Sequence, residues 1–284
     1  MIWLDPGPDA LYWMDALPFD PRHVDALVVS HAHTDHYGNI ICTIEAITGA
    51  TEIKKTKVVI GNSTSLEGAE DSPPLIPGYH RKMILKSVIS ARAGDAYSFG
   101  DIQITALPSD HRETQHTSDS LNWCVDIPVG RRTIQIVQFD GNVFATRDGA
   151  PTDVALDDIT SFAVDCDILI VNVSNHVRSR NCAQNYVSTD GLLYLARTTN
   201  ASVIFTTHFG IEMLCISEEE MEALGALGLS SVPEFQATYC QAELKALGRV
   251  KPVIIQASDG LRVDITDDTL NLVLDRQPTR RLEW

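Results

Sequence analysis

Three histidines and one aspartate lie within six residues, in the segment His31-Ala32-His33-Thr34-Asp35-His36. With 9 histidines in 284 residues, this pattern arises by chance in about one such sequence in two thousand. Three imidazoles packed together gain nothing in a protein core unless something shares their nitrogen lone pairs. Neutral imidazoles and a carboxylate are ligands that Zn²⁺, Fe and Mn²⁺ accept. The segment therefore predicts a metal site.

The flanking residues predict where this segment lies. Residues 26–30 form an apolar run typical of a buried strand, and residues 38–48 have the apolar spacing of a helix. An earlier strand fragment over residues 2–5 stops at Pro6-Gly7-Pro8, and residues 9–17 again have helical spacing. We therefore expect the histidine segment to connect a buried strand to a helix.

Strand-like and helix-like segments alternate along the rest of the chain. Further strands are expected over residues 57–61, 168–173 and 202–207. Helices are expected over residues 189–198, where Ser188 could be the N-cap, and over residues 217–225 and 233–247. Residues 62–78, rich in Ser, Pro and Gly, are expected to form a loop.

Three hairpins are expected, each where a short turn signal separates two strand-like runs. The turn signals are Gly100-Asp101, Pro128-Val129-Gly130 and Asp259-Gly260. Mixed strands, hairpins and outer helices favour an α/β sandwich with helices on both outer faces. Because the chain has no repeat, low-complexity tract or long linker, we expect residues 1–284 to form a single domain.

The composition indicates a cytoplasmic protein. The net charge of −16 disfavours large nucleic acids and anionic lipid as partners. No apolar run approaches the roughly 18 residues that span a bilayer, and the first residues lack the features of a signal peptide. The 6 cysteines form no C-x-x-C pair, which in a chain of this length indicates reduced, mostly buried thiols.

Several motifs resemble those of the metallo-β-lactamase-fold hydrolases, in particular the RNase Z-like, phosphodiesterase-type branch. A strand followed by Asp5-Pro-Gly-Pro, and then Ser30-His-x-His-x-Asp-His36, matches the first two motifs of that family. The remaining three motifs are single residues at strand ends, and they fit His111, Asp140 and His208 in the family's order. The resemblance implies an αββα four-layer sandwich, with two mixed β-sheets flanked by helices.

The resemblance also implies a site for two divalent metal ions, Zn²⁺ first, with Mn²⁺ or Fe as alternatives. Its ligand set gives each ion three or four protein ligands and an open position for water, as a catalytic metal site requires. The first ion would take His31, His33 and His111, the second would take Asp35, His36 and His208, and Asp140 would bridge them. Asp5 would orient one of the metal-bound histidines.

Two positions depart from the family pattern. His116 is an alternative to His111, which we prefer because it directly follows the strand expected over residues 102–107. Family members usually have one or two strands before the Asp-Pro-Gly-Pro turn, whereas this chain starts almost at the turn. A missing edge strand leaves backbone groups that pair with another chain, so a homodimer is a candidate assembly.

The expected reaction is hydrolysis by a hydroxide that bridges the two metal ions, because paired ions lower the pKa of a water from about 16 toward about 7. Asp35 and Asp140 are the candidate catalytic carboxylates, and Asp35 could take a proton from the nucleophile. His116 and His176 are candidate proton donors to the leaving group. Arg112 is a candidate phosphate ligand in the pocket.

A phosphodiester or related phosphoester in a small or short substrate is the first expectation for what is cleaved. The alternative is a lactone, thioester or other carboxyl ester or amide, attacked by the same hydroxide. A further alternative is a non-hydrolytic protein, either an oxygen-binding di-iron protein or a metal-dependent binding module.

Overall fold

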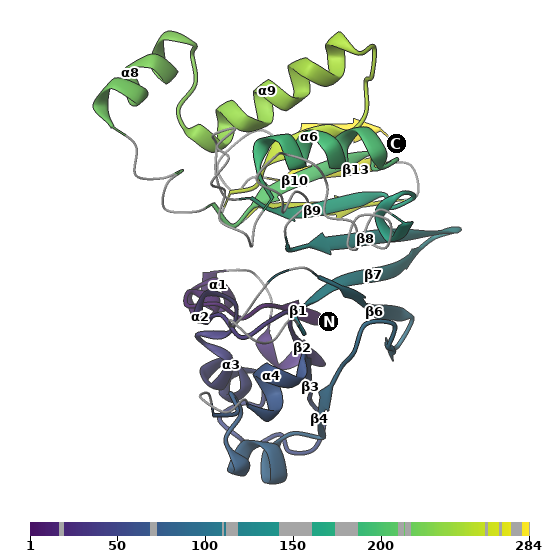
Figure 1. The fold of residues 1–284 in the computed structure, drawn as a ribbon. Helices are drawn as coiled ribbons and strands as arrows, with labels where there is room; N and C mark the ends of the chain where they lie inside the picture. Colours follow the sequence, from purple (N-terminus) through teal and green to yellow (C-terminus); the bar gives the residue numbers. More distant parts are fainter. Residues whose placement is uncertain are drawn as a thin grey trace. The chain divides into compact units, whose positions relative to one another are not determined.

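A computed structural model describes residues 1–16, 20–68, 73–109, 111, 119–141, 161–173, 187–209, 213, 217–258, 261–266, 269–273 and 280–283. The chain divides into two compact units. Unit 1 comprises Met1–Pro108 with Arg112–Leu121, and unit 2 comprises Ser109–His111 with Asn122–Trp284. Both units contain strands and helices (Figure 1). The expectation of a single domain stays a prediction.

Unit 1 contains a parallel sheet of four strands in the order β1-β2-β3-β4. The strands are β1 (Ile2–Leu4), β2 (Ala26–Val29), β3 (Val58–Gly61) and β4 (Ser87–Ser90). The first three confirm the strands expected around residues 2–5, 26–30 and 57–61. In a parallel sheet, the carboxyl ends of the strands lie at the same edge. Asp5, directly after β1, and Ser30, directly after β2, therefore both lie at that edge.

The described part of unit 1 also contains four α-helices, one 3₁₀-helical turn and one π-helical turn. They are α1 (Ala10–Ala16), η1 (Pro21–His23), α2 (Thr34–Tyr37), α3 (Ile40–Ile47), α4 (Ser63–Glu67) and the π-helical turn η2 (His80–Ile84). Apolar residues of α1 and α3, including Met14, Ile40 and Ile44, form one buried core with Leu27 and Val29 of β2. This packing follows from the helical spacing of the apolar residues.

The expected loop over residues 62–78 is wrong in its first part, because α4 lies there. Asn62 is the N-cap of α4, and its side-chain oxygen accepts a hydrogen bond from the Ser65 backbone N–H at 3.3 Å. An asparagine cap satisfies one of the helix's unpaired N–H groups.

A hairpin of β5 (Ala96–Phe99) and β6 (Ile102–Pro108) completes unit 1 and confirms the turn at Gly100-Asp101.

Unit 2 contains strands in the order β11-β10-β9-β8-β7 within one sheet. They are β7 (Leu121–Val129), β8 (Arg132–Phe139), β9 (Ile168–Asn172), β10 (Val203–Thr207) and β11 (Val253–Gln256). The β7–β8 pair is antiparallel and the other pairs are parallel. The β7–β8 turn is confirmed as a hairpin, but Val129 lies opposite Arg132 and Pro128 is within the strand. The turn is therefore Gly130-Arg131, with Gly130 at φ +56°.

Three helices of unit 2 begin at serine N-caps. They are α6 (Thr189–Thr198), α8 (Glu218–Ala226) and α9 (Val232–Ala246), capped by Ser188, Ser217 and Ser231. Each serine hydroxyl accepts a hydrogen bond from a backbone N–H in the first turn. Helix α9 packs against β11 and α6 (Figure 1). All three helices confirm the sequence prediction.

The last expected hairpin is wrong. Strand β11 pairs in parallel with β10, whereas β12 (Arg262–Ile265) pairs with β13 (Thr269–Val273), which pairs with β14 (Arg280–Glu283). The proposed turn residues, Asp259 and Gly260, lie outside the described residues. A turn signal acts locally, whereas the pairing partner of β11 is set by β10, about 50 residues earlier in the chain.

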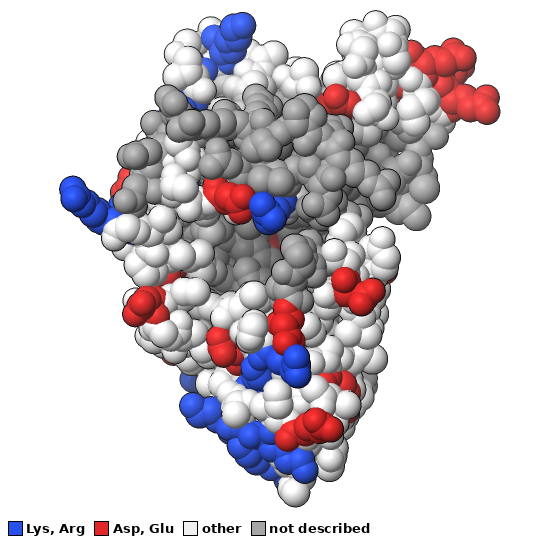
Figure 2. Space-filling model, turned by 180° about the vertical axis from the view of Figure 1, so that it is seen from behind, with Lys and Arg blue, Asp and Glu red and all other residues white. Residues whose placement is uncertain are grey.

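The described residues form a mixed α/β fold with several sheets and helices, which confirms the predicted class. On the face drawn in Figure 2, acidic side chains are interspersed with uncharged and basic ones. Among the described helices, none is both long enough and apolar enough to cross a membrane.

Candidate metal centre

The histidine segment begins directly at the end of β2. All four residues of this strand are buried, and Ser30 and His31 that follow are fully buried as well. His33 has an extended backbone, with φ −89° and ψ 140°, and is the N-cap residue of α2. Asp35 is exposed in the first turn of α2, whereas His36 is buried. The buried strand predicted from the sequence therefore leads into the short helix α2, which the sequence analysis did not predict, and the helix predicted over residues 38–48 follows as α3.

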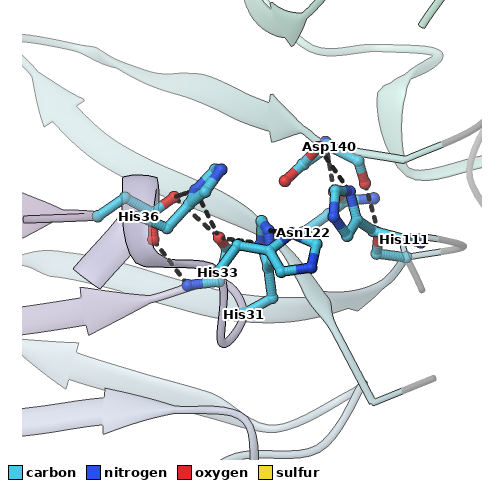
Figure 3. Close-up of polar contacts among 9 residues, drawn as sticks. His31, His33, His36, His111, Asn122 and Asp140 are labelled. Carbon is cyan, nitrogen blue, oxygen red and sulfur yellow. Dashed lines mark hydrogen bonds and ion pairs between the residues drawn. The ribbon is translucent and has the colours of Figure 1, made fainter. Parts of the chain in front are cut away.

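The histidine side chains of unit 1 converge. His31 Nε2 lies 3.1 Å from His33 Nδ1, and the rings of His31 and His36 have centroids 3.9 Å apart (Figure 3). Asp35 and His36 also offer ligand atoms within 4.8 Å of one another. Two ring nitrogens at 3.1 Å need a hydrogen or a cation between them, because their lone pairs otherwise repel. This donor set fits a divalent metal ion.

The Asp5 carboxylate lies beside the histidines. Its Oδ2 atom is 3.0 Å from His36 Nδ1 and accepts a hydrogen bond from the Ser30 hydroxyl at 2.9 Å. Its Oδ1 atom accepts a hydrogen bond from the Ser30 backbone N–H at 2.7 Å. The Asp5 backbone is left-handed, with φ +47°, an uncommon conformation for a residue with a side chain. The carboxylate predicted to orient a histidine therefore contacts His36.

His111 and Asp140 form a second cluster, within unit 2. Asp140 directly follows β8, and its Oδ1 atom lies 3.2 Å from His111 Nδ1 (Figure 3). Both side chains are almost completely buried. The Ser109 hydroxyl donates to the Asp140 carbonyl oxygen and accepts the His111 backbone N–H at 3.1 Å. Ser109 thereby holds the backbones of both predicted ligands.

Asn122 supports Asp140 from β7. Its side-chain oxygen accepts the Asp140 backbone N–H at 2.6 Å, and Asn122 is 2% exposed. The site residues predicted from the sequence do not include Asn122, Ser30 or Ser109. The signal for Ser30 was a polar residue at the end of an apolar run.

His208 directly follows β10, as predicted, and is partly buried. Its backbone is left-handed, with φ +57°. Asp5 and His208, both at strand ends, share this uncommon backbone conformation. Left-handed backbone at residues other than glycine concentrates at functional sites, although unit 1 also has it at Ala50, Thr51 and Lys55.

The sequence predicts three pocket residues besides the metal ligands. Arg112, His116 and His176 lie outside the described residues. The choice between His111 and His116 as ligand therefore stays a prediction. The burial of His111 and its contact with Asp140 favour His111.

Three of the described cysteines are buried thiols that are poor nucleophiles near neutral pH. Burial raises the pKa of Cys124, Cys166 and Cys240 to about 12 each, so all three stay protonated near neutral pH. Cys42 is exposed, so three of the four described cysteines are buried, in agreement with the expectation of mostly buried thiols. Cys182 and Cys215 lie outside the described residues.

Comparison with known proteins identifies the family. Residues 1–209 match the β-lactamase superfamily domain, and the chain belongs to this family. A curated relative, the uncharacterized protein MJ1374 of Methanocaldococcus jannaschii, is 34% identical over 109 residues, which are 38% of this chain and 40% of the relative. The matched segment therefore spans less than half of that relative.

Solved structures support the same fold. The metallo-β-lactamase fold protein YhfI from Bacillus subtilis has a TM-score of 0.61 at 14% identity, over 90% of this chain and 83% of that one. Zn²⁺-bound PqqB from Methylobacterium extorquens has a TM-score of 0.56 at 10% identity, over 93% and 83%. The resemblance predicted from the motifs, and the fold class that it implied, are confirmed.

Proposed function

We propose that the protein is a hydrolase that uses two divalent metal ions, most simply Zn²⁺, to cleave a phosphodiester or related phosphoester in a small or short substrate. Membership of the β-lactamase superfamily supports the metal-dependent hydrolase class. The convergence of His31 and His33 nitrogens at 3.1 Å is the observation that carries the proposal, because a bound cation satisfies both lone pairs at once.

The proposed ligands come from the two clusters already described and from His208, which follows β10. Unit 1 supplies His31, His33, Asp35 and His36. Unit 2 supplies His111, Asp140 and His208, in the order of the family's remaining motifs. Bound divalent ions would supply a water that is deprotonated near neutral pH, and positive charge beside the reacting substrate oxygen.

The surrounding side chains have separate roles in this proposal. Asp5 accepts the His36 Nδ1 hydrogen, so the His36 Nε2 lone pair points away from the carboxylate. Asp35 is exposed on α2, where its carboxylate can accept a proton from the attacking water. Ser109 and Asn122 fix the Asp140 backbone through its carbonyl oxygen and its N–H.

The substrate class rests on the Asp5-Pro-Gly-Pro turn, which resembles the phosphodiesterase-type branch. The net charge of −16 supports a small or short substrate over a large nucleic acid. A local positive charge is then needed to attract a phosphate, and bound metal ions supply it.

The test is hydrolysis by the metal-loaded protein of bis-p-nitrophenyl phosphate, compared with a panel of lactones and thioesters. We expect the phosphodiester to be cleaved, and cleavage to stop when a chelator removes the metal. A protein that opens a lactone or thioester and leaves the phosphodiester intact is a carboxyl hydrolase, and the proposed substrate class is then wrong.

Elemental analysis of protein purified without added metal tests the remaining alternative. Two zinc ions per chain support the proposal. Two iron atoms with an oxygen-dependent absorption spectrum, and no hydrolysis, indicate a di-iron protein of the same fold.

Cytoplasmic location and a homodimer complete the proposal. The free thiols Cys124, Cys166 and Cys240 support a reducing compartment.

Strand β1 is at the end of the order β1-β2-β3-β4, so its outer edge is the part of this sheet that a second copy would pair with. Light scattering during size-exclusion chromatography measures the mass, and a monomer at micromolar concentration contradicts the dimer.

A further inference from the structure

The Ser30 hydroxyl contacts two histidines and one carboxylate. Its Oγ atom lies 2.9 Å from His31 Nδ1, 3.2 Å from His36 Nδ1 and 2.9 Å from Asp5 Oδ2. Ser30 is fully buried, so this hydroxyl cannot exchange these contacts for water. All four residues belong to unit 1. A single hydroxyl group therefore connects His31 with His36.

The number of available hydrogens determines which atom donates and which atom accepts in each of these contacts. An ionised Asp5 carboxylate only accepts, so His36 Nδ1, 3.0 Å from Asp5 Oδ2, must carry a hydrogen. The single Ser30 hydrogen points to Asp5 Oδ2, because a hydrogen bond to a charged acceptor is about twice as strong as one to a neutral nitrogen. The Ser30 oxygen then has only lone pairs left for His31.

The His31 tautomer follows from this assignment. His31 Nδ1 has to donate to Ser30 Oγ, since two lone pairs would otherwise face each other at 2.9 Å. A neutral imidazole with its hydrogen on Nδ1 has its lone pair on Nε2. In His31 this is the atom that faces His33 Nδ1 at 3.1 Å.

We propose that Ser30 is a positioning residue that fixes His31 and His36 together in the Nδ1–H tautomer, and so couples the two metal positions. This inference rests on the proposed function, which assigns His31 to one metal ion and His36 to the other. Asp5 Oδ2 lies 3.0 Å from His36 Nδ1, whereas the Ser30 hydroxyl contacts the Nδ1 atoms of both His31 and His36. Loss of the Ser30 hydroxyl removes an acceptor for His31 Nδ1 and an acceptor for His36 Nδ1, so both metal positions weaken.

The tautomers can be measured directly in the metal-free protein. In protein with ¹⁵N-labelled histidine, the protonated and unprotonated ring nitrogens give separate resonances. We expect His31 and His36 of the wild type each to show a single Nδ1–H tautomer. In Ser30→Ala, His31 should become a mixture of tautomers, and Ser30→Thr should restore the single form because it keeps the hydroxyl. A wild-type His31 with its hydrogen on Nε2 overturns the inference.

Zinc affinity tests the coupling. In competition with a chromophoric chelator, Ser30→Ala should bind both zinc ions about 10–100-fold more weakly, the effect typical of losing a partner of a metal-bound histidine. Ser30→Thr should recover most of the affinity. The matched control is Ser63→Ala, which removes a serine hydroxyl that donates to the Asp119 carboxylate at 2.5 Å. It should leave zinc affinity unchanged.

The outcomes separate this inference from the proposed function. The coupling is wrong if Ser30→Ala binds both zinc ions as tightly as the wild type, or if it binds only one of them more weakly. Either result overturns the coupling even if the enzyme cleaves phosphodiesters. A wild type that binds two zinc ions with the expected Ser30 dependence, yet hydrolyses none of the esters, supports the coupling and defeats the proposed function.

Discussion

Gly7 and Asp35 approach each other more closely than any residue other than glycine would permit. A Cβ atom added at Gly7 would lie 2.2 Å from the Asp35 carbonyl oxygen, well inside van der Waals contact. The Gly7 N–H donates to the Asp5 carbonyl oxygen at 2.8 Å, and the Asn39 N–H donates to the Pro6 carbonyl oxygen at 3.1 Å. The turn after β1 therefore packs directly on the backbone of α2.

Replacing Gly7 should disturb the site and the stability together. We expect Gly7→Ala to lower the free energy of unfolding by about 1–3 kcal/mol, because the added methyl has to displace the α2 backbone. Urea unfolding and zinc content measure the two effects. Gly78→Ala is the control, since a Cβ at Gly78 meets nothing within 4 Å. Equal stability of the two variants would contradict the close approach.

The ligand assignment predicts loss of metal without loss of fold. His33→Ala and Asp140→Ala should each bind less zinc and lose activity, because each removes a proposed ligand, while the far-UV circular dichroism spectrum stays unchanged. His23→Ala, on the exposed turn η1, is the control histidine. Full zinc occupancy in either ligand variant would show that the assignment is wrong.

The two candidate histidines for the third motif should behave differently. His111→Ala should lose zinc, because His111 is fully buried and contacts Asp140. His116→Ala should keep it. Zinc stoichiometry by elemental analysis, compared at equal protein concentration, decides between them. Loss of metal in His116→Ala alone would transfer the assignment to His116.

The hydrogen bonds of Asp119, in unit 1, predict that part of the free energy of unfolding depends on pH. Its carboxylate accepts hydrogen bonds from the Asn62 side chain, the Ser63 hydroxyl and the Thr64 backbone N–H. Burial raises the pKa of Asp119, but hydrogen bonds from Ser63, Thr64 and Asn62 outweigh burial and hold it below its usual 3.8. A carboxylate whose pKa is lower in the folded state than in the unfolded state stabilises the fold at pH values above its unfolded-state pKa. This stabilisation is lost as the pH falls through the folded-state pKa.

Asp119→Ala should therefore be less stable than the wild type by about 1–2 kcal/mol near neutral pH, allowing for the partial exposure of the carboxylate. The difference should shrink as the pH falls below 3.8. Urea unfolding at a series of pH values measures it, with Asp15→Ala, at an exposed position of α1, as the control. A difference that grows on acidification would reverse the predicted sign.

Thiol labelling should follow exposure. Among the described cysteines, Cys42 is exposed, whereas the pKa of Cys124, Cys166 and Cys240 is raised to about 12 by burial. We expect iodoacetamide to modify Cys42 first in the native protein, and the three buried thiols only after denaturation. Peptide mass spectrometry locates the modified residues. Early labelling of Cys240 would contradict the packing of α9.

The metal ligands of unit 1 could be predicted from the sequence because their chemistry is local. His31, His33, Asp35 and His36 are adjacent in the chain, and the apolar run before them identifies β2. Serine caps such as Ser188 act within one helical turn, so the helices that they begin were also predictable.

The features that sequence reasoning missed depend on residues far apart in the chain. Helix α4 is supported by Asp119, more than 50 residues after its N-cap. The role of Ser30 depends on Asp5, 25 residues earlier. In both cases a tertiary hydrogen bond, rather than local spacing, determines the structure, and no local pattern predicts such a bond.

The pairing of β10 with β11 determines how this protein can be shortened. The family match ends at residue 209, directly after the strand that precedes His208, whereas β11 begins at Val253. A fragment cut at the end of the match would retain His208 but expose the full edge of β10, which pairs with β11 over four residues. Exposed strand edges promote aggregation, so such a fragment would keep every proposed ligand and still be poorly soluble.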